Sequence, residues 1–219
     1  MWTVASEHEF DEKLISDRNP VGFKPSPALI AESKRETFRI NSVRNALDYY
    51  DAGRYSAVIG SSPVCANLLH HAVELMMKAC LAKNDTIEQI LAYGHEQSYR
   101  HDLKKLRDAL IVRVPALAEF NSLINDLQQW EAIRYPDSII EKGAQMTVSL
   151  FDTPVVAPSI SMPEPSYKLQ LYDVDRLMGA LLVTTGLNRD CFLSDMGEKR
   201  ALIYKDKLRE TYLGGPRAV

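Results

Sequence analysis

The sequence predicts an all-α protein: an up-and-down bundle of about five helices with an irregular or small β-ribbon insertion at about 143–171. In several long stretches, apolar residues recur every three or four positions, as they do in helices with one buried face. The alternation typical of strands occurs only in two short pieces of that insertion. A hydrophobic content of 46% and a charged content of 25% are those of a globular domain. They exclude a disordered, collagen-like or disulfide-stapled chain.

We expect three parts along the chain. Residues 1–32 form an irregular N-terminal extension, because several prolines interrupt any long element there. Residues 33–195 form the helical domain with its insertion. Residues 196–219 form a C-terminal helix and tail.

The first helix is expected to begin at Ser33, which has capping-box spacing to Glu36, and to end at Gly53. A second helical region follows at 54–83, and Pro63 either restarts or kinks it. This region is apolar on most of its circumference, which predicts a place in the middle of the bundle. One polar stripe remains on it, formed by Asn67, His71, Glu74 and Lys78.

Four further elements are expected. Thr86 and Gln89 form a capping-box pair that opens a short helix at 86–93. Helices at about 101–112 and 116–133 follow, and the last begins at the N-cap Asp173 and runs to about 193. Between these last two helices, the two alternating pieces either pair as a small antiparallel ribbon or belong to a long ordered loop.

Cysteine content and terminal sequence predict a cytoplasmic protein. The three cysteines are an odd set without CxxC spacing, so we expect no structural disulfide. The first residues lack a basic flank followed by an apolar run, so they do not resemble a signal peptide. Every apolar stretch is interrupted before about 18 residues, so we expect no membrane span. The net charge of −3 argues against a DNA-coating protein, although residues 100–107 sum to +3.

Three short motifs occur in order: a Glu/Lys helix, a His-Asp-Leu helix start, and an Arg-Tyr-Pro after the next helix. In this order they resemble the HEPN superfamily of all-α domains, over roughly residues 33–137 with 173–193 as the last helix. The matching residues are Ala72, Glu74, Lys78, Ala79 and Leu81, then His101, Asp102, Leu103 and Leu106, then Arg134, Tyr135 and Pro136.

The resemblance implies a homodimer, with the helices expected at 116–133 and 173–193 as candidates for its interface. It also implies an origin among toxin–antitoxin, antiphage and RNA-processing systems. HEPN ribonucleases carry an Arg followed after about four to six residues by a His, which supplies the proton transfer in metal-independent cleavage. Here Arg134 has no His after it, because all five histidines precede it: His8, His70, His71, His95 and His101.

We therefore expect a HEPN-like, non-catalytic binding or accessory module for a nucleotide or RNA, in a defence or toxin–antitoxin setting. Its candidate ligand-binding residues are His71, Glu74, Lys78, Arg100, Lys104, Lys105 and Tyr135. Two structural interpretations stay open beside this one. The polar stripe forms a seam between helices, and His101 or Asp102 caps a helix.

Two other functions remain open. One is a divergent ribonuclease that uses Arg134 with Asp137 and His101. The other is a protein–protein interaction module that binds a partner protein through 143–171 or its C-terminal helix.

No metal or cofactor is expected. There is no P-loop, GxGxxG or GxSxG motif. His71 and Glu74 form only one short-spaced pair, whereas a di-iron bundle needs several. The neighbours His70 and His71 point about 100° apart on a helix, which argues against joint chelation.

Overall fold

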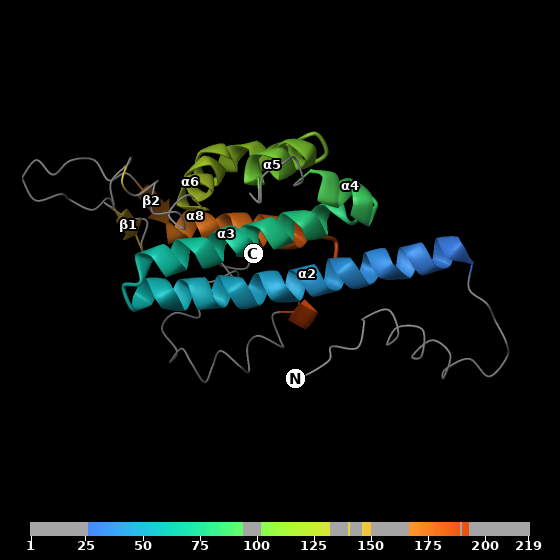
Figure 1. Ribbon diagram of the computed structural model, residues 1–219, viewed down its shortest axis with the longest axis horizontal. Helices are drawn as coiled ribbons and strands as arrows, with labels where there is room; N and C mark the ends of the chain where they lie inside the picture. Colours follow the sequence, from blue (N-terminus) through green and yellow to red (C-terminus); the bar gives the residue numbers. More distant parts are fainter. Residues whose placement is uncertain are drawn as a thin grey trace, which may run out of the picture. The chain divides into compact units, whose positions relative to one another are not determined.

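The computed structural model shows a mostly helical protein with one small sheet, which confirms the predicted fold class (Figure 1). The chain divides into two compact units, residues 1–34 and 35–219. The hydrophobic core lies in the second unit. The structure describes residues 26–93, 102–131, 140, 146–149, 167–188 and 190–192.

Helix α2 (Pro27–Val58) begins earlier than Ser33 and continues past Gly53, so both predicted ends are wrong. Ser26 Oγ accepts a hydrogen bond from the Leu29 amide at 3.3 Å, and Pro27 occupies the first helical position, where no amide donor is needed. The Ser26-Pro27 pair therefore starts the helix. Ser33 lies inside it, where its capping-box pattern has no free amide groups to satisfy.

Gly53 has a packing role rather than a capping role. A Cβ atom at this position would lie 2.8 Å from the Leu69 side chain and 3.3 Å from the Cys65 carbonyl oxygen. The missing side chain therefore lets α2 approach α3 (Ser62–Leu81) closely. The chain turns instead at Gly60, whose φ of +80° is left-handed. Pro63 then restarts the helix as part of the first turn of α3.

Helix α3 lies in the middle of the bundle, as its all-round apolar pattern predicts (Figure 1). It packs against α5 (Leu103–Ile111), α6 (Asn121–Glu131) and α8 (Leu171–Thr184). Its buried side chains are those of Cys65, Ala66, Leu69, His70, Ala72, Val73, Glu74, Met76, Met77, Ala79, Cys80 and Leu81.

The short helix α4 (Ile87–Ala92) has the predicted capping box between Thr86 and Gln89. Asp102 caps α5 by accepting from the amides of Lys104 and Lys105. The helix predicted at 116–133 is two elements, the 3-10 helix η1 (Pro115–Phe120) and α6.

The two alternating pieces do form strands, β1 (Met146–Ser149) and β2 (Tyr167–Gln170), but they pair in parallel. The predicted antiparallel ribbon is therefore wrong in direction. Residues 150–166 supply the dozen or more residues that a parallel connection requires, so no hairpin turn imposes antiparallel pairing. Trp130 of α6 donates to the Lys168 carbonyl at 3.1 Å, which attaches β2 to the bundle.

Helix α8 follows β2 directly, with Gln170 at its N-cap position. Asp173 lies in the first turn instead of capping the helix, which corrects the predicted start. The predicted end near 193 is also too late, because Gly186 takes a left-handed φ of +71° just after the last turn. None of the described helices is long and apolar enough to cross a membrane.

A buried polar cluster joins α2 to α8. Both carboxylate oxygens of Asp175 accept hydrogen bonds from Arg54, and the Tyr50 hydroxyl donates to Oδ1 at 2.6 Å. Burial raises the pKa of Asp175, although Arg54 and Tyr50 both oppose the shift. Sequence patterns do not reveal this cluster, because its members lie on different helices, 121 residues apart for Arg54 and Asp175.

Candidate functional site

The polar stripe on α3 forms a local ion-pair cluster around Glu74. Glu74 is only 1% exposed. Its Oε1 lies 2.5 Å from Lys78 Nζ, and its Oε2 lies 3.2 Å from His71 Nδ1. Both partners come from neighbouring turns of the same helix, at the i+4 and i−3 positions that share a face. The predicted contact among these three residues is therefore present.

The edge of this cluster reaches the protein surface. The side chains of His71 and Lys78 are 28% and 16% exposed. Tyr49 of α2 packs edge-on against the His71 ring, with the ring centroids 5.0 Å apart. Glu74 is buried and paired with residues of its own helix, so within this cluster only the His71 and Lys78 side chains reach the surface. The seam between helices stays a prediction.

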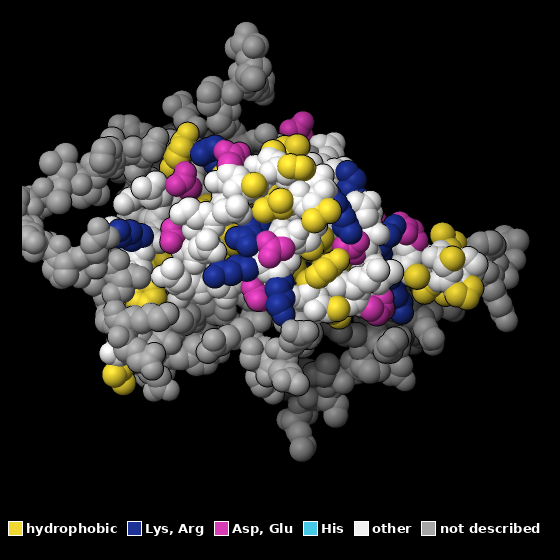
Figure 2. Space-filling model, turned by 90° about the horizontal axis from the view of Figure 1, so that it is seen from above, with side chains coloured by type: hydrophobic (Ala, Val, Ile, Leu, Met, Phe, Trp, Pro, Cys, Tyr) yellow, Lys and Arg dark blue, Asp and Glu magenta, His cyan; other side chains and the backbone are white. Residues whose placement is uncertain are grey.

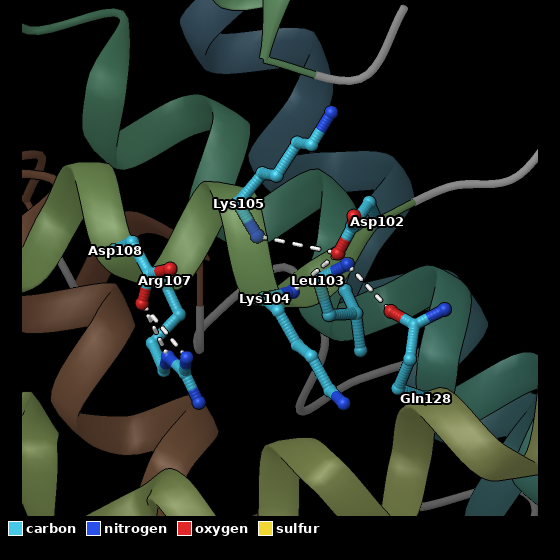
Figure 3. Close-up of polar contacts among 7 residues, drawn as sticks. All are labelled: Asp102, Leu103, Lys104, Lys105, Arg107, Asp108 and Gln128. Atoms are coloured by element: carbon cyan, nitrogen blue, oxygen red, sulfur yellow. Dashed lines mark hydrogen bonds and ion pairs between the residues drawn. The ribbon is translucent and has the colours of Figure 1, made fainter. Parts of the chain in front are cut away.

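The second predicted site is the beginning of α5, drawn in Figure 3. Asp102 Oδ1 accepts from the amides of Lys104 at 3.0 Å and Lys105 at 3.3 Å. The Leu103 amide donates to Gln128 Oε1 of α6 at 2.7 Å. The first backbone donors of the helix are thus used within the protein, and none of these three is left to hold a phosphate.

The lysine side chains of this turn remain accessible. Lys104 and Lys105 are exposed, and in Figure 3 their side chains diverge from the helix while Asp102 occupies its N-terminus. Arg107 instead turns to Asp108, with its Nε 2.9 Å and its Nη2 2.7 Å from Oδ1. A ligand attracted to this turn would therefore meet two ammonium groups rather than a continuous basic rim.

The surrounding charge is mixed. On the face shown in Figure 2, the described Lys and Arg side chains stand beside Asp and Glu rather than forming one basic area. Within 102–108, three basic side chains oppose two acidic ones, which gives +1. Adding Asp108 lowers the sum predicted for 100–107 from +3 to +2, and leaving out Arg100, which lies outside the described residues, lowers it to +1.

The remaining candidate residues lie outside the described part of the chain. They are Arg100, His101, Arg134, Tyr135 and Asp137. Their predicted roles, including the divergent ribonuclease site, stay predictions.

His70 is a candidate site residue that sequence reasoning missed. One donor atom each from His70, His71 and Glu74 lies within 4.8 Å of the others, a group able to hold a metal ion. The expectation that these two neighbouring histidines do not chelate together stays a prediction. The available signal was the i, i+4 spacing of His70 and Glu74, which places them on one face.

The two cysteines of the core are not suited to act as nucleophiles. Burial raises the pKa of the Cys65 thiol and of the Cys80 thiol to about 12 each. Both remain neutral thiols at physiological pH, as expected for cysteines in an apolar stripe. Cys191 is exposed, and all three cysteines are free.

Comparison of the chain with protein-family models, with curated proteins and with solved structures found no match. The HEPN resemblance therefore depends on the motifs and their order alone.

Proposed function

We propose that this chain is a HEPN-like, non-catalytic module that binds the phosphates of a nucleotide or RNA, in a defence or toxin–antitoxin setting. The observation that carries the proposal is the pair of exposed ammonium groups, Lys104 and Lys105, on the turn that carries the HEPN-like Asp-Leu motif. Because the backbone donors of that turn are already used, binding is electrostatic.

The proposal also implies that the chain does not cleave RNA. Arg134 has no downstream histidine to move the proton that cleavage requires. Lys78 contributes little to phosphate binding, since Glu74 already balances its charge.

The test combines RNA cleavage with binding of a labelled single-stranded RNA and of a labelled mononucleotide, followed by fluorescence anisotropy. We expect the RNA to stay intact. The variant Lys104→Glu/Lys105→Glu should weaken RNA binding about tenfold at 0.1 M salt. It should also lower the salt slope of log K by about 1.4, since each lost phosphate contact removes about 0.7.

The matched control is Lys34→Glu/Arg44→Glu, which makes the same change in net charge at two exposed positions of α2. It should keep wild-type affinity apart from a small general effect. Equal losses in both variants, or cleavage that Arg134→Ala abolishes, would overturn the proposal.

A further inference from the structure

His70, His71 and Glu74 occupy positions around α3 that make their side chains converge. Each helical residue is rotated by about 100° from the last, so Glu74 lies about 40° from His70 and about 60° from His71 in projection. Helical side chains lean toward the N-terminus, and the Glu74 carboxylate therefore leans back between the two imidazoles. This is why the donor atoms of all three come within 4.8 Å.

The dimensions of the group fit a small divalent ion. Zinc bonds to His nitrogen and carboxylate oxygen measure about 2.0–2.2 Å, which puts two ligand atoms of a tetrahedral site about 3.3 Å apart. His71 Nδ1 and Glu74 Oε2 are separated by 3.2 Å. One of the three distances between protein ligands thus already matches a tetrahedral site, and the other two, at up to 4.8 Å, must shorten when the ion binds.

The surroundings suit a metal as well. Lys78 contacts Oε1 of Glu74, so Oε2 is the oxygen directed at His71. A carboxylate that contacts an outer partner through one oxygen can still ligate through the other. Tyr49 packs against the His71 ring and limits its rotation. The His71 side chain is 28% exposed, so this edge of the cluster is in contact with solvent, which could supply a fourth, water ligand.

We propose that His70, His71 and Glu74 bind one divalent transition-metal ion of the zinc class, with two imidazole nitrogens and one carboxylate oxygen as its protein ligands. The donor set of two His and one Glu with an open fourth position is one that zinc uses in proteins. This site is separate from the phosphate-binding turn of the proposed function, and each can be tested without the other.

The experiment titrates the metal-depleted full-length protein with Zn²⁺ by calorimetry and with Co²⁺ by visible absorption. We expect one ion per chain with a Kd of about 1 µM or tighter. Loss of a residue that only contacts a metal ligand lowers metal affinity by about 10- to 100-fold. His71→Ala and Glu74→Gln each remove a ligand itself, so each should lower the affinity by more than that. His71 is partly exposed, so its variant tests the site even where Glu74→Gln does not fold.

Two further variants test the competing contact of Lys78 and the part of the other histidines in binding. Lys78→Met should bind metal several-fold more tightly, because its ammonium group no longer competes for the Glu74 carboxylate. The triple variant His8→Ala/His95→Ala/His101→Ala removes the remaining histidines and should bind as wild type does. Circular dichroism confirms that each variant is folded.

Three results would overturn the proposal: no binding at up to millimolar Zn²⁺, binding that survives in His71→Ala and Glu74→Gln, or loss of binding in the triple histidine variant. The first of these identifies the cluster as a structural ion-pair group alone. None of them bears on RNA binding by Lys104 and Lys105, whose assay contains no metal.

Discussion

At the scale of single residues, burial decides which groups can react. Cys65 and Cys80 lie in the core with a pKa of about 12, because the apolar surroundings disfavour the charged thiolate. Arg54 lowers the pKa of Cys65, but by less than burial raises it. The sulfur of Cys80 also donates to the Leu181 carbonyl at 3.2 Å. These thiols therefore act as small apolar side chains.

Thiol labelling of the native protein tests this effect. At pH 8 a thiol of pKa 12 is ionised about a thousandfold less than an ordinary cysteine, so we expect fast labelling of Cys191 alone. Cys65 and Cys80 should label only after unfolding. Mass spectrometry identifies the sites, with Cys191→Ser as the control. Labelling of Cys65 in the folded protein at the rate of Cys191 would contradict the prediction.

At the scale of elements, polar contacts determine how helices join. Arg54 and Asp175 connect α2 to α8 away from water, whereas Arg176 and Glu119 connect α8 to η1 at the surface. Removing one member of a buried pair leaves a desolvated charge, while a surface pair loses little because water replaces the partner. Two arginines with similar partners therefore differ greatly in their contribution to stability.

Arg54→Met should lower the free energy of unfolding by about 3–5 kcal/mol, and Arg176→Met by less than about 1 kcal/mol. Without Arg54, the pKa of Asp175 rises further. The folded state then holds a proton that the unfolded chain releases, so the stability of Arg54→Met falls as the pH rises from about 4.

Urea denaturation at several pH values measures both effects. The double variant Arg54→Met/Asp175→Leu should recover part of the loss, because it removes the unpaired charge. Equal, small losses of stability in the two single variants would show that the buried pair contributes no more to the free energy of unfolding than the surface pair.

At the scale of the whole molecule, α3 organises the bundle. More than half of its 20 residues are buried, and α5, α6 and α8 surround it together with α2 at Gly53. The outward side of α8 carries exposed apolar groups, with Tyr172 44% and Val183 64% exposed. Since the HEPN resemblance nominates this helix for a dimer interface, these groups are where we expect the second copy to pack.

We predict that the chain of 24.7 kDa sediments at twice that mass. Val183→Asp should yield the monomer without unfolding it, because an aspartate buried in the interface has no partner. Val112→Asp, at a residue 83% exposed next to α5, is the control and should stay dimeric. Analytical ultracentrifugation distinguishes the outcomes; a monomeric wild type would remove the dimer hypothesis.

Parts of the fold could be predicted because their signals are local. The capping box of Thr86 and the cap at Asp102 depend on residues within one turn, and the structure confirms both. At Ser33 and Asp173 the same type of signal predicted the wrong helix start, since a capping pattern has no effect once the helix has begun at an earlier residue. Gly53 was misassigned because the contact that requires a glycine lies on another helix.

The candidate site also has one part that local spacing predicts and one part that it does not. The contact of Glu74 with Lys78 and His71 follows from helical spacing, and was predicted. The convergence of His70 with them was not, because it depends on side-chain directions as well as on spacing.

Local patterns in the chain are enough to establish an all-α protein, the central position of α3 and the polar stripe it carries, because helical periodicity places each residue relative to its neighbours. The pairing of Arg54 with Asp175, the parallel direction of β1 and β2, and the close approach at Gly53 all join residues distant in sequence. Such contacts depend on the path of the whole chain, so only the folded molecule specifies them.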